Sequence, residues 1–333
     1  MKEVLRSMLR ISELDSRILK CLLEDGRESF ADVAEKCGVT KNKVWKRYKA
    51  MEKKGIITGA TIQVNFAGLG YDAVATLLVS VEAQQIDNVI QKIGEIREIR
   101  AYRHYNSAYN IRGVTILRDL SELDHVKEVM RRRIPISGLK TYIWTGVKNI
   151  PQNLKLRPKG EIAENKHSQT LETAQRKQIN ETRVDELDWE IVNKLTLNGR
   201  TSFNKIAHEI GTSTDTVVKR YHKLKEKGVI KVLIQINLNR LGYQALLDFN
   251  IASVSSVSLS GITESLESIP DVVVITKTSG DYDLQVTAAV RDVEQMFALQ
   301  EEIAKVPGIT KIETSARRIP DAWPSPQQHI STY

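Results

Sequence analysis

The sequence predicts a mixed α+β protein that is built from two tandem copies of one two-part unit. When the 333-residue sequence is shifted by 173 positions, residues 14–57 align with residues 187–230 without a gap, and 17 of these 44 positions are identical. In each copy, apolar residues first recur at helical spacing and later fall into short runs that are typical of strands. The chain is therefore expected to alternate twice between a helical part and a sheet part.

The helical part of the first copy is expected to hold three short helices with clear end signals. Ser12, followed by Asp15 three residues later, predicts a capped helix with an acidic first turn. Ser29 is expected to cap the second helix, Gly38 to end it in left-handed backbone, and Thr40 to cap the third. The second copy repeats these signals at Ser202, Gly211, Ser213 and Gly228.

A short strand over 57–65 is expected to close the first helical part. Each sheet part then follows the order strand, helix, strand, strand, helix, strand, which is typical of a ferredoxin-like fold. In the first copy these elements are expected at 73–81, 86–93, 96–103, 111–117, 123–131 and 139–144. In the second copy they are expected at 245–252, 262–269, 272–278, 284–290, 293–303 and 309–314.

The expected domains follow from these elements. We expect winged helix-turn-helix domains at 1–62 and 184–235, ferredoxin-like domains at 63–157 and 236–319, a polar linker at 158–183, and a proline-containing tail at 320–333.

Composition narrows the class of protein only slightly. The net charge of +8 and the isoelectric point of about 9.3 weakly favour a polyanionic partner. Cys21 and Cys37 fall on apolar helix positions and are expected to be buried thiols, with neither a disulfide nor a metal site. The sequence shows no signal peptide and no run of about 18 apolar residues. We therefore expect an intracellular protein, cytoplasmic and nucleoid-associated, with no cofactor and no membrane partner.

The third helix of the first copy has the composition of a DNA-recognition helix. In a helix-turn-helix, this helix enters the major groove and its first residues face the base edges. Residues 40–54 hold six lysines, one arginine and one glutamate, a net charge of +6. Asparagine can read adenine and arginine can read guanine, whereas lysines mainly reach phosphates. The residues expected to contact double-stranded DNA are Thr40, Lys41, Asn42, Lys43, Lys46 and Arg47.

The third helix of the second copy is less basic. Residues 213–227 hold four lysines, one arginine and two acidic residues, a net charge of +3. Its Asp215 repels phosphate but can accept a hydrogen bond from cytosine. This copy therefore either reads a different half-site or binds DNA weakly. Its candidate contacts are Ser213, Thr214, Asp215, Thr216, Lys219 and Arg220.

These residues resemble those of the Lrp/AsnC (leucine-responsive / asparagine regulator) family. The matching marks are the Leu-Asp that opens each copy, the Gly-Arg before the second helix, and the Gly-Ile or Gly-Val-Ile exit after the third. The resemblance implies a transcription regulator whose βαββαβ domain drives dimerisation and often binds an amino acid. The chain departs from the family in carrying two copies instead of one.

The resemblance also points to an effector site. In the family, a glycine-containing turn before the third strand of the regulatory domain borders the amino-acid site. The second copy carries Gly280, Asp281, Tyr282 and Asp283 at this place, whereas the first has Ser107, Ala108, Tyr109 and Asn110. If an effector binds, it is therefore expected in the second copy; the alternative is that Gly-Asp serves only as an ordinary turn former.

Charge indicates how the copies could assemble. Residues 61–157 hold fourteen basic and nine acidic residues, whereas residues 240–313 hold five and eleven, which favours pairing of copy one with copy two within or between chains. From the resemblance we expect a homodimer or larger closed assembly, with four heads in a dimer. The alternative is a monomer that is folded as a pseudo-dimer.

Two other functions remain open from the sequence. Siroheme decarboxylases share this domain plan, and an enzyme of that kind would use Arg103, His104 and Arg112. A chromatin-like architectural protein would coat DNA with little sequence preference. We expect a regulator and no enzyme, because no decarboxylase signature accompanies these three residues.

Overall fold

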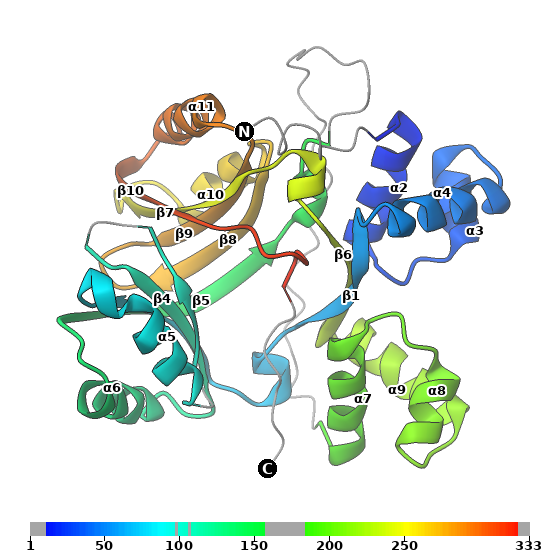
Figure 1. Ribbon diagram of the computed structural model, residues 1–333, viewed down its shortest axis with the longest axis horizontal. Helices are drawn as coiled ribbons and strands as arrows, with labels where there is room; N and C mark the ends of the chain where they lie inside the picture. Colours follow the sequence, from blue (N-terminus) through cyan, green and yellow to red (C-terminus); the bar gives the residue numbers. More distant parts are fainter. Residues whose placement is uncertain (1–10, 97–98, 106–107, 157–183, 326–333) are drawn as a thin grey trace. The chain divides into compact units, whose positions relative to one another are not determined.

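The computed structural model describes residues 11–96, 99–105, 108–156 and 184–325 (Figure 1). These residues form two compact units. The head unit contains both helical parts and residues 151–156 and 319–325, and the sheet unit contains the described residues of 70–150 together with 245–318. The expected linker at 158–183 lies outside the described residues.

Head 1 is the helical part of the first copy. It contains α2 (Glu13–Glu24), α3 (Phe30–Cys37), α4 (Lys41–Lys53) and strand β1 (Ile57–Val64). The expected ends are confirmed: Ser12 and Asp15 form a reciprocal capping box, Ser29 and Thr40 cap the next two helices, and Gly38 adopts φ 63°. Cys37 is buried as expected, but Cys21 is only half-buried.

Head 2 repeats this arrangement in the second copy. It contains α7 (Glu186–Leu197), α8 (Phe203–Glu209), α9 (Thr214–Glu226) and strand β6 (Ile230–Ile236). Each head thus supplies a single strand. The two strands pair antiparallel with each other, and no third strand joins them in the described part of the chain.

The pairing of β1 with β6 joins the heads into one unit. β1 packs against α7 and β6 packs against α2, so the first helix of each copy rests on the strand of the other. The tail also takes part, because Trp323 forms a backbone bridge with Ile236 and Gln235 donates a hydrogen bond to the carbonyl of Pro324. The described start of the expected irregular tail is therefore docked on the head unit.

The sheet unit holds one eight-stranded antiparallel sheet in the order β10-β7-β9-β8-β5-β2-β4-β3. The first copy supplies β2 (Ala73–Ser80), α5 (Ile86–Gly94), β3 (Ile99–Arg103), β4 (Ile111–Leu117), α6 (Glu122–Arg133) and β5 (Gly138–Asn149). The second supplies β7 (Ala245–Ser253), α10 (Leu259–Glu267), β8 (Val272–Ser279), β9 (Leu284–Val290), α11 (Val293–Ala304) and β10 (Ile309–Arg317). The predicted βαββαβ order is confirmed in both copies.

Each copy has its own apolar core between its helices and its strands. In copy one, Leu77, Val89 and Met130 belong to this core, and in copy two Phe249 and Leu266 do. The opposite face of the sheet is more polar, because alternate residues of the same strands point there. The sheet therefore has a second face, opposite the helices, on which residues of the two copies meet. We call this face the inner surface.

The two copies meet along β5 and β8. The strand expected at 139–144 continues to Asn149, and Ile143–Asn149 pairs antiparallel with β8. At the other end of the sheet, Tyr105 bridges to Ala316 of β10. The sheet therefore curls until its two ends meet, and copies one and two are paired within the chain. Among the described helices, none is both long enough and apolar enough to cross a membrane.

Candidate nucleic-acid interface

The outer face of α4 presents the predicted DNA-contacting side chains. Val44, Tyr48 and Met51 are buried against the rest of head 1, and this stripe turns the opposite face of the helix outward. The residues exposed on that face are Lys41, Asn42, Lys43, Trp45, Lys46 and Lys49. The structure thus brings together all the predicted lysines with Asn42, and it adds Trp45, which the sequence analysis did not single out.

Arg47 lies apart from this group, because it faces its own head. Its Nε donates to Asp15 at 2.7 Å, its second nitrogen pairs with the other carboxylate oxygen, and Ser12 accepts a further bond at 3.3 Å. Burial raises the pKa of Asp15, but the bonds from Arg47 and Ser12 outweigh burial and leave it below its ordinary value. This ion pair holds α4 on α2, and it explains the Leu-Asp that opens each copy.

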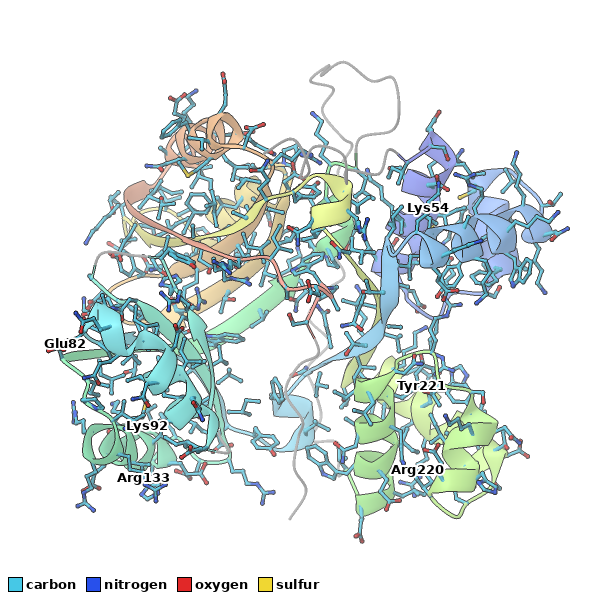
Figure 2. The ribbon with its side chains drawn as sticks, in the orientation of Figure 1. Lys54, Glu82, Lys92, Arg133, Arg220 and Tyr221 are labelled. Atoms are coloured by element: carbon cyan, nitrogen blue, oxygen red, sulfur yellow. The ribbon has the colours of Figure 1, made fainter. Side chains whose placement is uncertain are left out.

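Head 2 has the same latch and a less basic outer face. Arg220, which is labelled in Figure 2, pairs with Asp185 and donates to Asp188 at 3.1 Å. The outer face of α9 exposes Asp215 and Lys219. An open hollow of about 240 Å³ is lined by Thr216, Lys219, Arg220 and Lys223. Because Arg220 is engaged by the two aspartates, Lys219 and Lys223 are the cations of this hollow that suit a phosphate group.

The heads are locked by two equivalent arginines, which the sequence analysis noted only as part of the Gly-Arg mark shared by both copies. Arg27 of head 1 donates to the carbonyls of Gly199 (3.1 Å) and Thr201 (2.8 Å), and its Cζ lies 4.1 Å from the centre of the Phe203 ring. Arg200 of head 2 lies 5.0 Å from the centre of the Phe30 ring. The same Gly-Arg in both copies was the available signal.

The glycine before each arginine allows the backbones to meet. A Cβ on Gly26 would lie 2.6 Å from the carbonyl carbon of Leu233, and one on Gly199 would lie 2.8 Å from the carbonyl oxygen of Thr61. The Gly26 amide donates to Val232 and the Gly199 amide donates to Ala60, both at 2.8 Å. The Gly-Arg element of each head therefore packs directly against the backbone and an aromatic ring of the other head.

The predicted effector turn is occupied by internal contacts of the sheet unit. Asp283 accepts bonds from the amide and hydroxyl of Ser253, and the Tyr282 hydroxyl donates to Glu313. Asp281 is exposed and pairs with Lys140 at 2.9 Å. Gly280 adopts φ 147° and packs so closely on Tyr142 that a Cβ would lie 2.8 Å from that ring.

The contrast between the copies at this turn is smaller than the sequence indicated. Asn110, the equivalent of Asp283, anchors its own turn in the same way, with its side chain bonded to the amide and carbonyl of Val81. The carboxylate of Asp283 is therefore accounted for by the turn. Asp281 is left as the acidic group that could meet a ligand.

A buried polar cluster joins the copies on the inner surface of the sheet unit, and we call it the polar core. Its members are Thr76, His104 and Arg112 of copy one and Asp248, Gln285, Ser315 and Arg317 of copy two. Arg112 and Gln285 occupy equivalent positions of the repeat, and Arg112 donates to Gln285 at 2.9 Å. Arg317 donates to Asp248 at 3.0 Å.

Asp248 is the only carboxylate among these seven residues, and it is 1% exposed. Burial raises its pKa, but the positive charges of Arg317 and Arg112 outweigh burial and hold the pKa well below its ordinary value, so the group stays ionised. Burial lowers the pKa of His104, and Asp248 only partly opposes this, so the imidazole is neutral near pH 7. Within the polar core, a cation of copy one, Arg112, thus faces a carboxylate of copy two, Asp248.

The candidate decarboxylase residues do not form one site. Arg103 pairs with Asp87 on the helical side of copy one, whereas His104 and Arg112 lie in the polar core. His104 bonds to Ser315 at 2.6 Å, and Arg112 bonds to Gln285. Among the described residues, no group of His, Cys, Asp or Glu is placed to hold a metal ion.

Three family models match the chain in the order of its parts. A winged helix-turn-helix DNA-binding model matches residues 11–58, an AsnC-type helix-turn-helix model matches 184–225, and an Lrp/AsnC ligand binding domain model matches 244–316. The first two matches coincide with heads 1 and 2. The third coincides with the sheet part of the second copy.

Two curated relatives each match between about a third and two fifths of this chain. An uncharacterised HTH-type transcriptional regulator of Pyrococcus furiosus is 34% identical over 141 residues, which cover 41% of this chain and 94% of the relative. The HTH-type transcriptional regulator LrpA of Pyrococcus horikoshii is 35% identical over 113 residues, which cover 34% of this chain and 80% of the relative.

A solved structure matches nearly the whole chain. The siroheme decarboxylase NirDL aligns with a TM-score of 0.62 over 91% of this chain and 90% of its own, at 16% sequence identity. At that identity the likeness concerns the fold alone. The tandem arrangement of heads and sheets is thus a known architecture.

Proposed function

This chain belongs to the Lrp/AsnC family, and from that premise we propose that it is a sequence-specific DNA-binding transcription regulator. The observation that carries the proposal is the outward face of α4, where four lysines, Asn42 and Trp45 are exposed on a helix whose opposite side is buried. A helix of this kind places base-reading and phosphate-binding groups together.

The predicted contacts divide into two roles. Asn42 reads a base edge in head 1, and Lys41, Lys43 and Lys46 bind phosphates, with Thr40 capping the helix that carries them. In head 2, Asp215 and Thr214 face the bases, Lys219 and Thr216 meet phosphate in the hollow, and Ser213 is the cap. Arg47 and Arg220 act mainly as latches that fix these helices.

The direct test is the salt dependence of binding by the full chain. Each phosphate contact contributes a slope of about 0.9 in log K against log salt concentration. Lys43→Ala with Lys46→Ala is therefore expected to flatten the slope by about 1.8 and to weaken binding. Lys20→Ala, which removes an exposed lysine from α2, is the control. Equal slopes for all three proteins contradict the role given to α4.

Control by a small amino-acid-like effector is the second element of the proposal. It is supported by the ligand binding domain model that matches 244–316 and by the exposed Asp281 beside Gly280. An α-ammonium group would compete with Lys140 for Asp281, because both are cations of similar size. Binding there would replace an ion pair that links the two copies near the β5–β8 junction, since Lys140 belongs to copy one and Asp281 to copy two.

We also propose that several chains assemble into a homo-oligomer. The β5–β8 pairing does not require a second chain, because both strands belong to the same chain. Light scattering decides between a homo-oligomer and an internally paired monomer. A mass near 37.6 kDa contradicts the oligomer, and a multiple of that mass supports it.

Two alternative functions have separate readouts. An architectural protein would protect DNA without a preferred sequence in a footprinting experiment, whereas the regulator protects defined sites. A siroheme decarboxylase-like enzyme would carry a tetrapyrrole absorbance band when mixed with that substrate. The placement of Arg103 apart from His104 and Arg112 favours the regulator over the enzyme.

A further inference from the structure

We propose that each chain is a complete reader of one unsymmetrical DNA site, with two unlike half-sites in inverted orientation. The inference rests on the proposed DNA-binding function and goes beyond it. It identifies the partner as a composite duplex site in which head 1 reads one half and head 2 reads the other.

The first step is that heads 1 and 2 of one chain are paired with each other in a fixed way. β1 pairs with β6 over seven residue pairs, and the Gly-Arg elements of both copies interlock. Lys225 of head 2 also pairs with Asp25 of head 1 at 2.7 Å. A recognition helix α4 is therefore presented together with an α9 of the same chain.

The second step is the relation between the heads. Arg27 lies over Phe203 and Arg200 lies over Phe30, and the Gly26 and Gly199 amides make matching bonds across the contact. Reciprocal contacts between equivalent residues, with antiparallel strands, are the mark of an approximate two-fold axis. Two heads related in this way meet half-sites of opposite direction along the duplex.

The third step is that the two reading faces differ at equivalent positions. Asn42 of α4 corresponds to Asp215 of α9, and both side chains are exposed. An asparagine amide pairs bidentately with adenine, because it both donates and accepts, whereas a carboxylate only accepts and matches the amino group of cytosine. The same position of the docked helix therefore specifies a different base in each half.

A second difference lies one turn further along. Trp45 of α4 is 47% exposed, and its equivalent in α9 is Val218. Trp45 shares the outer face of α4 with Lys41 and Lys49, one turn before and after it. A large apolar side chain on that face fits the methyl group of thymine. Head 1 is therefore assigned the half-site richer in adenine and thymine.

The test is selection of binding sites from a random duplex library with the full chain. The wild type is expected to enrich one motif with two unlike, inverted halves. Asp215→Asn with Val218→Trp is expected to convert the second half into a copy of the first. The reverse swap in head 1, Asn42→Asp with Trp45→Val, is expected to convert the first half and to lower affinity for the original site about tenfold or more.

Glu190→Gln is the matched control, because it removes one exposed carboxylate from head 2 outside α9. It is expected to leave the motif unchanged. Two identical halves in the wild-type motif, or a second half that ignores the swap, would each overturn the inference while leaving DNA recognition intact. If no motif is enriched, the proposed function itself fails, and the inference fails with it.

Discussion

Arg27 and Arg200 occupy equivalent positions in the two copies, and each guanidinium lies over the aromatic rings of the other copy. Arg27 lies over Phe203 and Tyr221, and Arg200 lies over Phe30 and Tyr48. Phe30 and Phe203 begin the second helix of their heads, and Tyr48 and Tyr221 belong to the recognition helices. The contact that joins the heads thus also touches the helices that are proposed to read DNA.

Removing one of these arginines should loosen the pairing of the heads. Arg27→Ala deletes two hydrogen bonds to carbonyls and the cation–π contacts with Phe203 and Tyr221, which together stabilise the head unit by about 2–3 kcal/mol. Hydrogen exchange at the amides of β1 and β6 is expected to accelerate. Arg17→Ala is the control, because Arg17 bonds a carbonyl within its own head. Unchanged exchange in Arg27→Ala contradicts the lock.

Neighbouring residues of α4 should respond differently to substitution. Arg47→Ala removes the partner of the buried Asp15 and is expected to lower the stability of head 1, with the salt slope of DNA binding nearly unchanged. Lys46→Ala is expected to flatten that slope by about 0.9 with little loss of stability. Denaturant unfolding and a salt titration separate the two. A slope loss in Arg47→Ala equal to that in Lys46→Ala, at full stability, would make Arg47 a DNA contact.

Periodicity and end signals predicted the elements well but not their partners. The caps at Ser12 and Thr40 are local, because each side chain bonds a backbone amide three residues away. The extension of β5 to Asn149 was missed, since its residues form a strand only by pairing with β8 of the other copy. Arg27 was missed for the same reason, because its carbonyl and ring partners lie more than 170 residues away in the sequence.

The reading of the site was limited in a similar way. Helical spacing placed Asn42, Lys43 and Lys46 outward correctly, but it placed Arg47 there too, since charge alone does not reveal a buried partner such as Asp15. Trp45 was not singled out, because an aromatic residue on a helix is expected to be buried until its exposure is known.

The polar core predicts a large effect from one carboxylate. Asp248→Asn leaves Arg112 without its buried counter-charge and weakens the hold on Arg317, and breaking a buried pair of this kind is destabilising by about 3–5 kcal/mol. The free energy of unfolding of the full chain measures the loss, with Asp124→Asn as the control for an exposed acid. A change no larger than that of the control means that the polar core does not hold the copies together.

Stability should fall as the solution is acidified through the range in which histidine titrates. Burial keeps the pKa of His104 below its ordinary value, so the unfolded chain takes up a proton at this residue first. The stability that depends on neutral His104 is fully present above about pH 6.5. As the pH falls below that value, the free energy of unfolding decreases by at most about 1.4 kcal/mol per pH unit because of this residue. His104→Gln is expected to show a flatter dependence between pH 7 and pH 5. Parallel curves for both proteins argue against a neutral buried His104.

The last prediction concerns the effector. Asp281 is the residue of the turn that we expect to bind the effector. Asp283 and Tyr282 are already bonded to Ser253 and Glu313. The Asp281 side chain is 65% exposed, and the bond described for it is the one to Lys140. A small zwitterion that displaces Lys140 is expected to raise the melting temperature of the wild type and to change DNA affinity by a coupling of about 1–3 kcal/mol. Asp281→Ala should lose both effects, and Asp292→Ala, which removes an exposed helix cap elsewhere in copy two, should keep them. A thermal-shift screen of the common amino acids against the three proteins measures this. If none stabilises the wild type, or if one stabilises Asp281→Ala equally, the effector does not bind at this turn.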